Sequence, residues 1–290
     1  MKVFFLGLGY CAEALIRRAP AIEPGGTTRS PERAASLRAA GIEAFVLDGR
    51  QIDPGLDRAL SQAEAIVVSV PPGEREDWLP GRLALAIAAA PALRRIVYYS
   101  TVGVYGDHGG AWVDEASATL ADSERGLARL RDEARWRARG AASGAATHIL
   151  RLPGIYGPGR NALARLKQGE ARRIVKPGHV TSRAHVDDIA EATRLALMSP
   201  LEGQIWNVAD DEPAPPQDVV AYAASLLGVP PPPEEAIESA SLSPMAASFY
   251  ADSKRVSNAR IKALLGFKPA YPTYREGLRA LMAAGEGRTE

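Results

Sequence analysis

The chain has 290 residues, with 46% hydrophobic residues, 24% charged residues and a formal net charge of +1 at pH 7. This is the composition of an ordinary globular protein, and it lacks the basic surplus needed to bind nucleic acid or an anionic membrane. We therefore expect neither a nucleic acid nor a membrane as a partner. Cys11 is the only cysteine, and no run approaches the ~20 apolar residues that span a bilayer. We therefore expect a cytoplasmic protein.

Short β-branched or aromatic runs alternate with helical stretches in the first half of the chain. The predicted strands are Lys2–Leu6, Ile22–Thr28, Glu43–Leu47, Ala65–Val70, Arg95–Ser100 and Thr147–Leu152. The predicted helices between them are Cys11–Arg18, Pro31–Ala40, Leu56–Gln62, Asp77–Ala89 and Asp122–Arg139. Several strands, such as AIVVSV and RIVYYS, are continuous apolar runs, which are typical of a parallel sheet covered on both faces. The alternation predicts an α/β fold with a doubly wound, Rossmann-type parallel sheet.

The pattern changes after Leu152. LPGIYGPGRN is rich in Pro and Gly and predicts a loop, whereas His185–Met198 has one apolar helix face and QIWNVAD predicts another strand. We predict a dinucleotide-binding Rossmann domain over residues 1–152, to which residues 182–211 return. A smaller C-terminal α/β lobe is expected over 153–181 and 212–285, with a frayed tail at 286–290.

A glycine-rich segment, GLGYCA, follows the first strand and opens a helix, as in the pattern G-x-G-x-x-A. The first glycine allows a tight turn, the second lets backbone N–H groups approach a pyrophosphate, and the small last residue packs the helix on the strand. The helix N-terminus adds partial positive charge. The pattern therefore predicts a dinucleotide site formed by Gly7, Gly9, Tyr10, Cys11 and Ala12, with a glycine-rich turn that binds nothing as the alternative.

The end of the second predicted strand indicates which dinucleotide binds. A site specific for NAD would carry an acidic residue there for the ribose 2′-hydroxyl. This chain instead carries Thr28, Arg29, Ser30 and Arg33, whose hydroxyls and guanidiniums suit a 2′-phosphate. We predict NADP rather than NAD, unless both arginines are merely solvated. Asp48 closes the third strand, either as an acceptor for the adenine amino group or as a turn residue.

Several further segments carry a resemblance to a known family. They are STVGVYG (Ser100–Gly106), RLPGIYGPG (Arg151–Gly159), SRAHVDDIA (Ser182–Ala190) and YADSKRVSNARIKALLGFKP. Over nearly its whole length the chain resembles the extended short-chain dehydrogenase/reductase family, which includes NAD(P)-dependent epimerases and dehydratases. Leu6 replaces the first glycine of the usual family pattern. The resemblance implies a homodimer, and it implies cofactor contacts from Val70, Pro71 and Pro153.

Catalysis in that family rests on a Ser or Thr, a Tyr that acts as acid or base, and a Lys four residues after the Tyr. By resemblance Thr101 takes the first position. Aligning RGLARLRDE with the family helix places Arg125 at the Tyr and Arg129 at the Lys. Arginine does not titrate in proteins, so the usual pair is absent. The match at Tyr250 and Lys254 lies in the C-terminal lobe, and we interpret it as chance.

Other residues are candidates for the missing roles. Arg125, Arg129 and Glu133 recur every four residues, either as a solvated charged stripe or with the guanidiniums holding an anionic substrate. Candidate proton donors are Tyr105, His185 and Tyr156; packing is the alternative for Tyr105, and helix capping for His185. Arg183 and Tyr156 are further candidate substrate contacts. No His or Cys has metal-ligand spacing, so no metal is expected.

These observations predict an NAD(P)-dependent oxidoreductase or epimerase-like enzyme with an atypical active site. Its substrate would be a small anionic compound with a carbonyl or hydroxyl group, oriented by Thr101. One alternative is a non-catalytic NADP-binding redox sensor or scaffold. The other is a sugar-nucleotide epimerase or dehydratase, which is disfavoured because Gly154 stands where such members of the family often carry a substrate-binding Asn.

Overall fold

The computed structural model describes residues 1–49, 52–72, 79 and 81–287, and these divide by their internal contacts into two units. Unit 1 comprises Met1–Thr101, Glu124–Arg151 and Ile189–Trp206. Unit 2 comprises Val102–Ser123, Leu152–Asp188 and Asn207–Glu290. The division differs from the predicted domain boundaries, most clearly at residues 102–123. These residues belong to unit 2 because their strand β6 (Trp112–Val113) pairs with β13 (Arg255–Val256).

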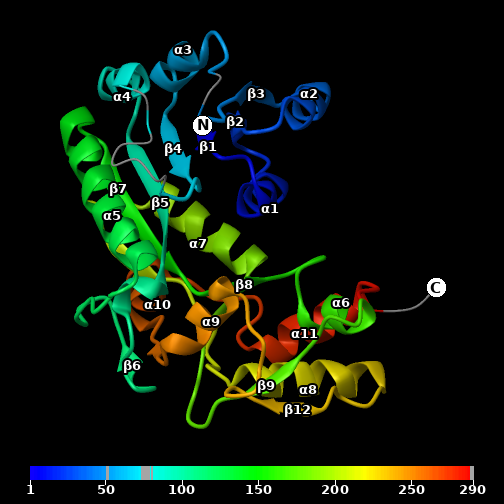
Figure 1. Cartoon of the computed structure of the whole chain (residues 1–290). Coiled ribbons are helices and arrows are strands. Elements are labelled where there is room, and N and C mark those ends of the chain that lie inside the picture. Colours follow the sequence, from blue (N-terminus) through cyan, green and yellow to red (C-terminus); the bar gives the residue numbers. More distant parts are fainter. Residues whose placement is uncertain (50–51, 73–78, 80, 288–290) are drawn as a thin grey trace. The chain divides into compact units, whose positions relative to one another are not determined.

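Unit 1 is built on a seven-stranded sheet in the order β11-β7-β5-β4-β1-β2-β3 (Figure 1). The strands are β1 (Lys2–Leu6), β2 (Glu23–Thr28), β3 (Glu43–Val46), β4 (Ala65–Val68), β5 (Arg95–Thr101), β7 (Ala146–Leu152) and β11 (Ile205–Asn207). The pairings from β3 through β2, β1 and β4 to β5 are all parallel. The structure thus confirms the predicted Rossmann-type sheet.

Helices cover this sheet. They are α1 (Tyr10–Arg18), α2 (Pro31–Ala39), α3 (Leu56–Ser61), α4 (Gly81–Ala88), α5 (Glu124–Ser143) and α7 (Val186–Met198). Leu56, Leu83 and Trp136, from α3, α4 and α5, pack in one buried cluster with Phe4 and Ile66 of the sheet. The predicted start of α4 at Asp77 lies outside the described residues. Within the described part of the chain, no helix is long and apolar enough to cross a membrane.

The order of the strands reverses at β1. Its neighbours β2 and β4 lead the chain toward opposite edges of the sheet. In open α/β sheets, ligands bind beyond the carboxyl ends of the strands at such a reversal. The glycine segment that begins at Gly7 follows β1 directly, so the fold places it at the expected binding crevice.

Unit 2 combines short parallel strand pairs with helices. The pairs are β8 (Gly154–Tyr156) with β10 (Arg183–His185), β9 (Arg173–Val175) with β12 (Glu234–Ala236), and β6 with β13. The helices are a 3₁₀ turn (Val102–Tyr105), α6 (Ala162–Lys167), α8 (Pro216–Leu227), α9 (Pro244–Ala251), α10 (Ala259–Leu265) and α11 (Tyr274–Ala283). Tyr156, Leu163, Ala223 and Leu278 share its buried core. Helix α11 begins with a capping box formed by Thr273 and Glu276.

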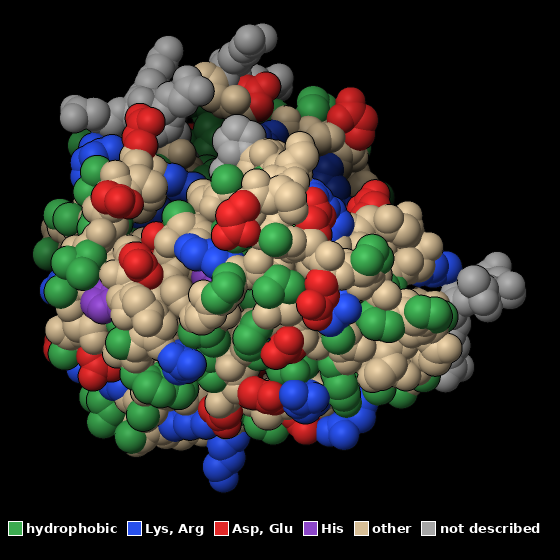
Figure 2. All heavy atoms as spheres, turned by 60° about the horizontal axis from the view of Figure 1, so that its bottom comes forward, with side chains coloured by type: hydrophobic (Ala, Val, Ile, Leu, Met, Phe, Trp, Pro, Cys, Tyr) green, Lys and Arg blue, Asp and Glu red, His purple; other side chains and the backbone are tan. Residues whose placement is uncertain are grey.

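The charged side chains are mixed in sign on the face drawn in Figure 2. Among its described residues, blue Lys and Arg side chains are interspersed with red Asp and Glu side chains. This view agrees with the formal net charge of +1.

Candidate cofactor and active site

The loop after β1 is pinned between the ends of β2 and β4. The Gly7 and Leu8 amides donate to the side chain and the carbonyl of Thr27, at 3.0 and 2.7 Å. The Ser69 hydroxyl donates to the Gly7 carbonyl at 2.8 Å. Gly7 has a φ of +102°, and a Cβ there would lie 2.5 Å from Ser69 Oγ. Only glycine fits this conformation and this contact.

Gly9 precedes α1 and has no side chain to cover the N-terminus of this helix. It is the N-cap residue and offers no side-chain hydrogen bond to the helix. A Cβ placed on Gly9 would meet no heavy atom of the described residues within 4 Å, whereas Ala12 is fully buried. An open second glycine at a helix N-terminus, followed by a small buried residue, fits the cradle that a dinucleotide pyrophosphate needs.

The candidate 2′-phosphate residues lie between β2 and α2. Ser30 caps α2 by accepting from the Arg33 amide at 3.1 Å, and the Arg33 guanidinium forms an ion pair with Glu13. Arg29 is exposed. Thr28 is partly buried, and its hydroxyl accepts from the Ser30 amide. Of the two arginines, Arg29 is therefore the one whose guanidinium is not already paired with an acid in the described structure.

The other predicted cofactor contacts follow strand ends. Asp48 is exposed two residues beyond β3, and Val70 and Pro71 follow β4. The Val70 amide donates to the Leu6 carbonyl at 3.2 Å, so this turn lies beside the end of β1. Pro153 lies in unit 2, between β7 and β8.

Helix α5 presents Arg129 to β5 at the position aligned with the family lysine. Its Nη1 donates to the Tyr98 hydroxyl at 3.1 Å and to the Tyr99 carbonyl at 2.8 Å. The guanidinium carbon lies 5.9 Å from the centre of the Tyr98 ring. Arg125, one turn earlier, is exposed. Arg129 thus ties α5 to β5, whereas Arg125 faces solvent.

Glu133 lies on the same side of α5 but is buried, with 6% of its surface exposed. It accepts two hydrogen bonds from Arg151 of β7, at 3.1 and 2.8 Å, and one from the Ser100 hydroxyl at 2.6 Å. Arg151 is 4% exposed. The solvated-stripe interpretation is therefore wrong at Glu133, which forms a buried bidentate ion pair between α5 and the sheet.

Thr101 and Tyr105 are only four residues apart along the chain, but they belong to different units. Thr101 ends β5 and is partly exposed. Tyr105 is fully buried in unit 2, where its hydroxyl donates to Asn207 Oδ1 at 2.8 Å. These contacts are those of the packing role named as the alternative for Tyr105, and its role as a proton donor stays a prediction.

His185 and Tyr156 are brought together by the β8–β10 pairing, in which they are register partners. Their ring centres lie 5.1 Å apart, edge to face, and the His185 ring also contacts Tyr271. His185 Nδ1 accepts from the Asp187 amide at 3.2 Å, a contact that stabilises the start of α7. Burial raises the pKa of the Tyr156 phenol above its ordinary value of 10.0, so the phenol stays protonated.

Arg183 and Asp210 extend this cluster. Arg183 Nη2 donates to Thr181 Oγ1 and the Ala214 carbonyl, at 3.0 and 3.1 Å, and the Asp210 amide donates to the Arg183 carbonyl at 2.8 Å. Asp210 is 3% exposed, and neither of its carboxyl oxygens has a hydrogen-bond partner in the described structure. Sequence reasoning missed Asp210, because nothing in VADDE shows which acid is buried.

Burial raises the pKa of the Asp210 carboxyl from 3.8 to about 8, although the Arg183 charge opposes the shift. Because the folded state holds this proton more tightly than the unfolded chain, the stabilisation is present below about pH 4 and is lost as the pH rises through 8. We expect the free energy of unfolding of unit 2 to fall by ~1.4 kcal/mol per pH unit across this window. Urea titrations from pH 4 to 8 measure the slope.

The Asp210→Asn variant should lack this part of the slope and should be more stable than the unsubstituted protein at pH 8. Asp218→Asn is the matched control, because Asp218 is exposed in the first turn of α8. Equal slopes in the unsubstituted protein and Asp210→Asn would contradict the neutral carboxyl.

Tyr250 and Lys254 do not form a helical pair. Tyr250 lies near the end of α9, and Lys254 lies beyond that helix. The Lys254 ammonium donates to the Gly106 carbonyl and to Asp252. Among the described residues, no group of three or more His, Cys, Asp or Glu side chains could hold a metal ion.

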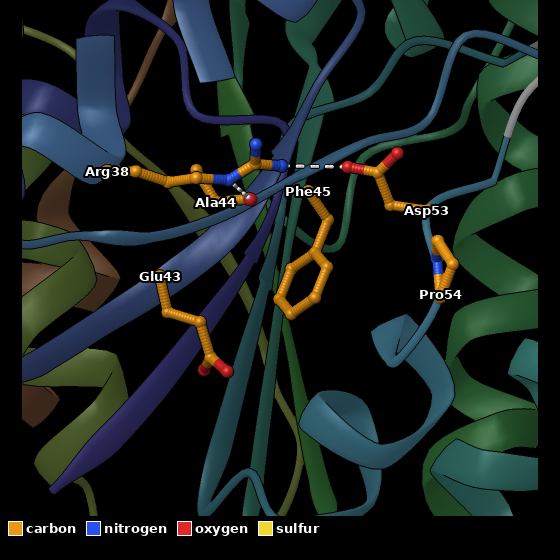
Figure 3. A pocket seen from close by; sticks show the side chains of 6 residues that line it. All are labelled: Arg38, Glu43, Ala44, Phe45, Asp53 and Pro54. Carbon is orange, nitrogen blue, oxygen red and sulfur yellow. Dashed lines mark hydrogen bonds and ion pairs between the residues drawn. The ribbon is translucent and has the colours of Figure 1, made fainter. Parts of the chain in front are cut away.

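A hollow of about 510 Å³ lies at the β3 edge of unit 1 (Figure 3). Arg38, Glu43, Ala44, Phe45, Asp53 and Pro54 line it. Figure 3 shows the Arg38 guanidinium directed at Asp53, to which it donates at 2.8 Å; it also donates to the Ala44 carbonyl at 2.7 Å. Its charge is thus already matched by Asp53, and we assign no ligand to this hollow.

Comparisons with known proteins find curated relatives that match about two thirds of the chain or more. No protein-family model matches it. It is 31% identical to Protein YeeZ of Escherichia coli (strain K12) over 252 residues, which cover 80% of this chain and 85% of that protein. It is also 30% identical to the 3-diazoavenalumate denitrifying reductase of a Streptomyces species over 204 residues, which cover 66% of each.

Two solved structures resemble the whole chain. A functionally unknown conserved protein from Silicibacter pomeroyi DSS is 42% identical and superposes with a TM-score of 0.88, over 98% of this chain and 99% of that one. A putative NAD-dependent epimerase/dehydratase from Methylobacillus flagellatus is 27% identical with a TM-score of 0.72, over 98% of both chains.

Proposed function

Because the chain belongs to the extended short-chain dehydrogenase/reductase family, we propose that it is an NADP-dependent oxidoreductase or epimerase-like enzyme. The proposed substrate is a small anionic compound with a carbonyl or hydroxyl group. The observation that carries the proposal is the pinned loop after β1, where Gly9 leaves the N-terminus of α1 open at the reversal point of the sheet.

We assign a role to each of the candidate residues. A bound nicotinamide supplies hydride exchange. Arg29 would contact the 2′-phosphate, and Thr101 at the end of β5 would orient the substrate oxygen. Arg125, which is exposed on α5, would attract the anionic group, and Arg129 would hold α5 against β5. Tyr105, His185 and Tyr156 are the candidate proton donors.

One relative supports a reduction as the reaction. The Streptomyces protein is named a reductase, and it shares 30% identity over 66% of this chain. By analogy, we propose that this chain too runs its hydride transfer from the reduced cofactor to the substrate.

A second candidate is a non-catalytic NADP-binding sensor or scaffold. The observation that favours it lies on α5, where Arg129 donates to Tyr98 and Tyr99 and Glu133 pairs with Arg151. On this helix the usual family member carries its catalytic Tyr and Lys, whereas here the side chains of Arg129 and Glu133 stabilise the packing of α5 on the sheet.

Single-turnover oxidation of bound NADPH distinguishes the two candidates. The protein is mixed with NADPH and then with a panel of aldehydes, ketones and oxo-acids, and the absorbance of the reduced nicotinamide is followed. An enzyme should oxidise the cofactor with at least one acceptor, and oxo-acids should react faster than neutral ketones. Tight NADPH binding without oxidation by any acceptor would leave the sensor as the better proposal.

Arg29→Asp tests the choice of cofactor. Loss of a charge-assisted contact to the 2′-phosphate is expected to weaken NADPH binding by about 10- to 100-fold, while NADH binding changes little. Calorimetry with both dinucleotides measures the two affinities. Arg58→Asp makes the same change of charge at an exposed position on α3 and should leave both affinities alone. Equal losses for the two dinucleotides in Arg29→Asp would refute the 2′-phosphate contact.

A further inference from the structure

A tight turn joins β9 to the segment before β10 in unit 2. The His179 amide donates to the Lys176 carbonyl at 3.1 Å, and Gly178 has a φ of +72°. With Pro177 in its second position and a left-handed glycine in its third, this turn has the residues of type II. It carries Lys176 and His179 at its two ends.

The turn packs against the end of α9 and the chain that follows it. The Lys176 ammonium donates to the Tyr250 carbonyl. The Val180 amide donates to the Ser253 hydroxyl at 3.1 Å. The His179 and Tyr250 rings lie 5.2 Å apart between centres, tilted by 32°. These contacts hold the imidazole inside unit 2.

His179 is buried, with 3% of its surface exposed, and neither ring nitrogen has a hydrogen-bond partner in the described structure. Every tautomer of imidazole carries at least one N–H donor. A buried donor with no acceptor costs about 1–3 kcal/mol. Burial, with the charges of Lys176 and Lys254, lowers the pKa of His179 below 6.5. A neutral ring thus has an N–H available for an acceptor that the described chain does not supply.

The charges around the ring show which acceptor fits. Lys254 is paired with Asp252, and the Asp107 carboxylate accepts from the Ser253 and Gly109 amides. Lys176 is partly buried and donates to the Tyr250 carbonyl. Besides the two amides, its charge helps to lower the pKa of the Asp107 carboxyl, but it makes no direct ion pair with any described residue. An ammonium that forms no direct ion pair therefore lies on the same turn as an imidazole N–H without an acceptor in the described structure. An oxyanion would satisfy both.

We propose that Lys176 and His179 form an oxyanion subsite in unit 2, which takes a carboxylate or phosphate group of a ligand. Pro177 and Gly178 at the tip of the turn are exposed, whereas the ring nitrogens are not, so the anion enters by an outward shift of this tip. This inference deepens the proposed function. Only one part of it, the assignment of the anion to the enzyme's substrate, rests on that function. The subsite itself rests on unit 2 alone.

Imidazole NMR tests the subsite without cofactor or turnover. The chain has four histidines, so long-range ¹H–¹⁵N spectra of the whole labelled protein are simple, and through-bond experiments assign His179. Inorganic phosphate and acetate are titrated separately at constant ionic strength. We expect the His179 resonances, and not those of His148 in unit 1, to shift saturably with at least one anion. The anion that binds more tightly identifies the phosphate or the carboxylate as the ligand group.

Two lysine variants complete the test. Lys176→Met should weaken the binding of that anion at least about tenfold, as expected for the loss of a charge-assisted contact. Lys268→Met removes the same charge from an exposed position of unit 2 and should change the affinity less than about twofold by the same measure. Unshifted His179 resonances with both anions, or equal affinities in Lys176→Met and the unsubstituted protein, would overturn the subsite.

The outcome is independent of the proposed enzyme activity. Saturable anion binding in a protein that never oxidises NADPH would keep the subsite and refute the oxidoreductase. Oxidation of NADPH by a protein whose His179 resonances shift with neither anion would support the oxidoreductase and refute the subsite.

Discussion

Replacing Glu133 with Ala is expected to lower the free energy of unfolding of unit 1 by about 3–5 kcal/mol. The variant leaves the Arg151 guanidinium buried at 4% exposure without its two acceptor oxygens. It also removes the acceptor of the Ser100 hydroxyl. Removing one partner of a buried ion pair costs far more than the pair contributes, and the expected effect is therefore large. Urea unfolding followed by tryptophan fluorescence measures it, because Trp136 is buried on α5, three residues after Glu133.

A matched control is available on α7 of the same unit. Glu191 and Arg194 form an ion pair at 2.7 Å whose side chains are 31% and 43% exposed. Glu191→Ala should cost at most about 1 kcal/mol, as exposed pairs do. The double variant Glu133→Leu with Arg151→Met should recover much of the lost stability, because it removes both charges together. Equal losses in Glu133→Ala and Glu191→Ala would contradict the buried pair.

Replacing Gly9 with Val is expected to weaken NADPH binding at least about 100-fold, or ~2.7 kcal/mol, without unfolding the protein. Gly9 has a φ of −114° and a ψ of −166°, a conformation that valine adopts readily. Its Cβ would meet no described atom within 4 Å, so the fold should tolerate the change. The new side chain would project where the pyrophosphate must approach the backbone. Calorimetry with NADPH and a urea titration measure affinity and stability on the same sample.

Gly81→Val is the matched control for this experiment. A Cβ on Gly81 also meets no described atom within 4 Å, but Gly81 begins α4 and does not belong to the loop after β1. We expect unchanged NADPH affinity in this variant. A Gly9→Val protein that binds NADPH as tightly as the unsubstituted protein would place the cofactor elsewhere. A Gly9→Val protein that unfolds would show that the fold itself requires glycine at this position, and it would contradict the assignment of this space to the cofactor.

The sheet was predictable because its signals are local. Strand β1 has the predicted bounds, Lys2–Leu6, and the five other strands predicted up to Leu152 differ from the observed ones by two residues or fewer at each end, whereas the strand predicted at QIWNVAD is shortened to β11 (Ile205–Asn207). Their continuous apolar runs lead to burial on both faces, as in β4, all four residues of which are buried. The glycine loop was predictable for the same reason, since its turn, cap and packing residues are adjacent along the chain.

The polar contacts were not predictable, because they join residues that are far apart along the chain. The spacing of Arg125, Arg129 and Glu133 shows that they share a helix side, but not that Glu133 faces Arg151 of another element. The one available signal was Arg151 itself, a charged residue in the apolar strand THILRL, which requires a buried partner. Neither Asp210 nor His179 gave even this signal, since their burial arises from the tertiary packing of unit 2.

The contacts of Arg129 limit how this protein could be re-engineered. A phenol and an amine grafted at residues 125 and 129 would restore the side chains of the usual family member. The graft would also take away the donor that the Tyr98 hydroxyl and the Tyr99 carbonyl share. A shorter amine has fewer donors in a less fixed geometry than a guanidinium. Installing the usual acid–base pair therefore calls for redesign of β5 together with α5, and a two-residue swap should yield a weakened scaffold before it yields an active one.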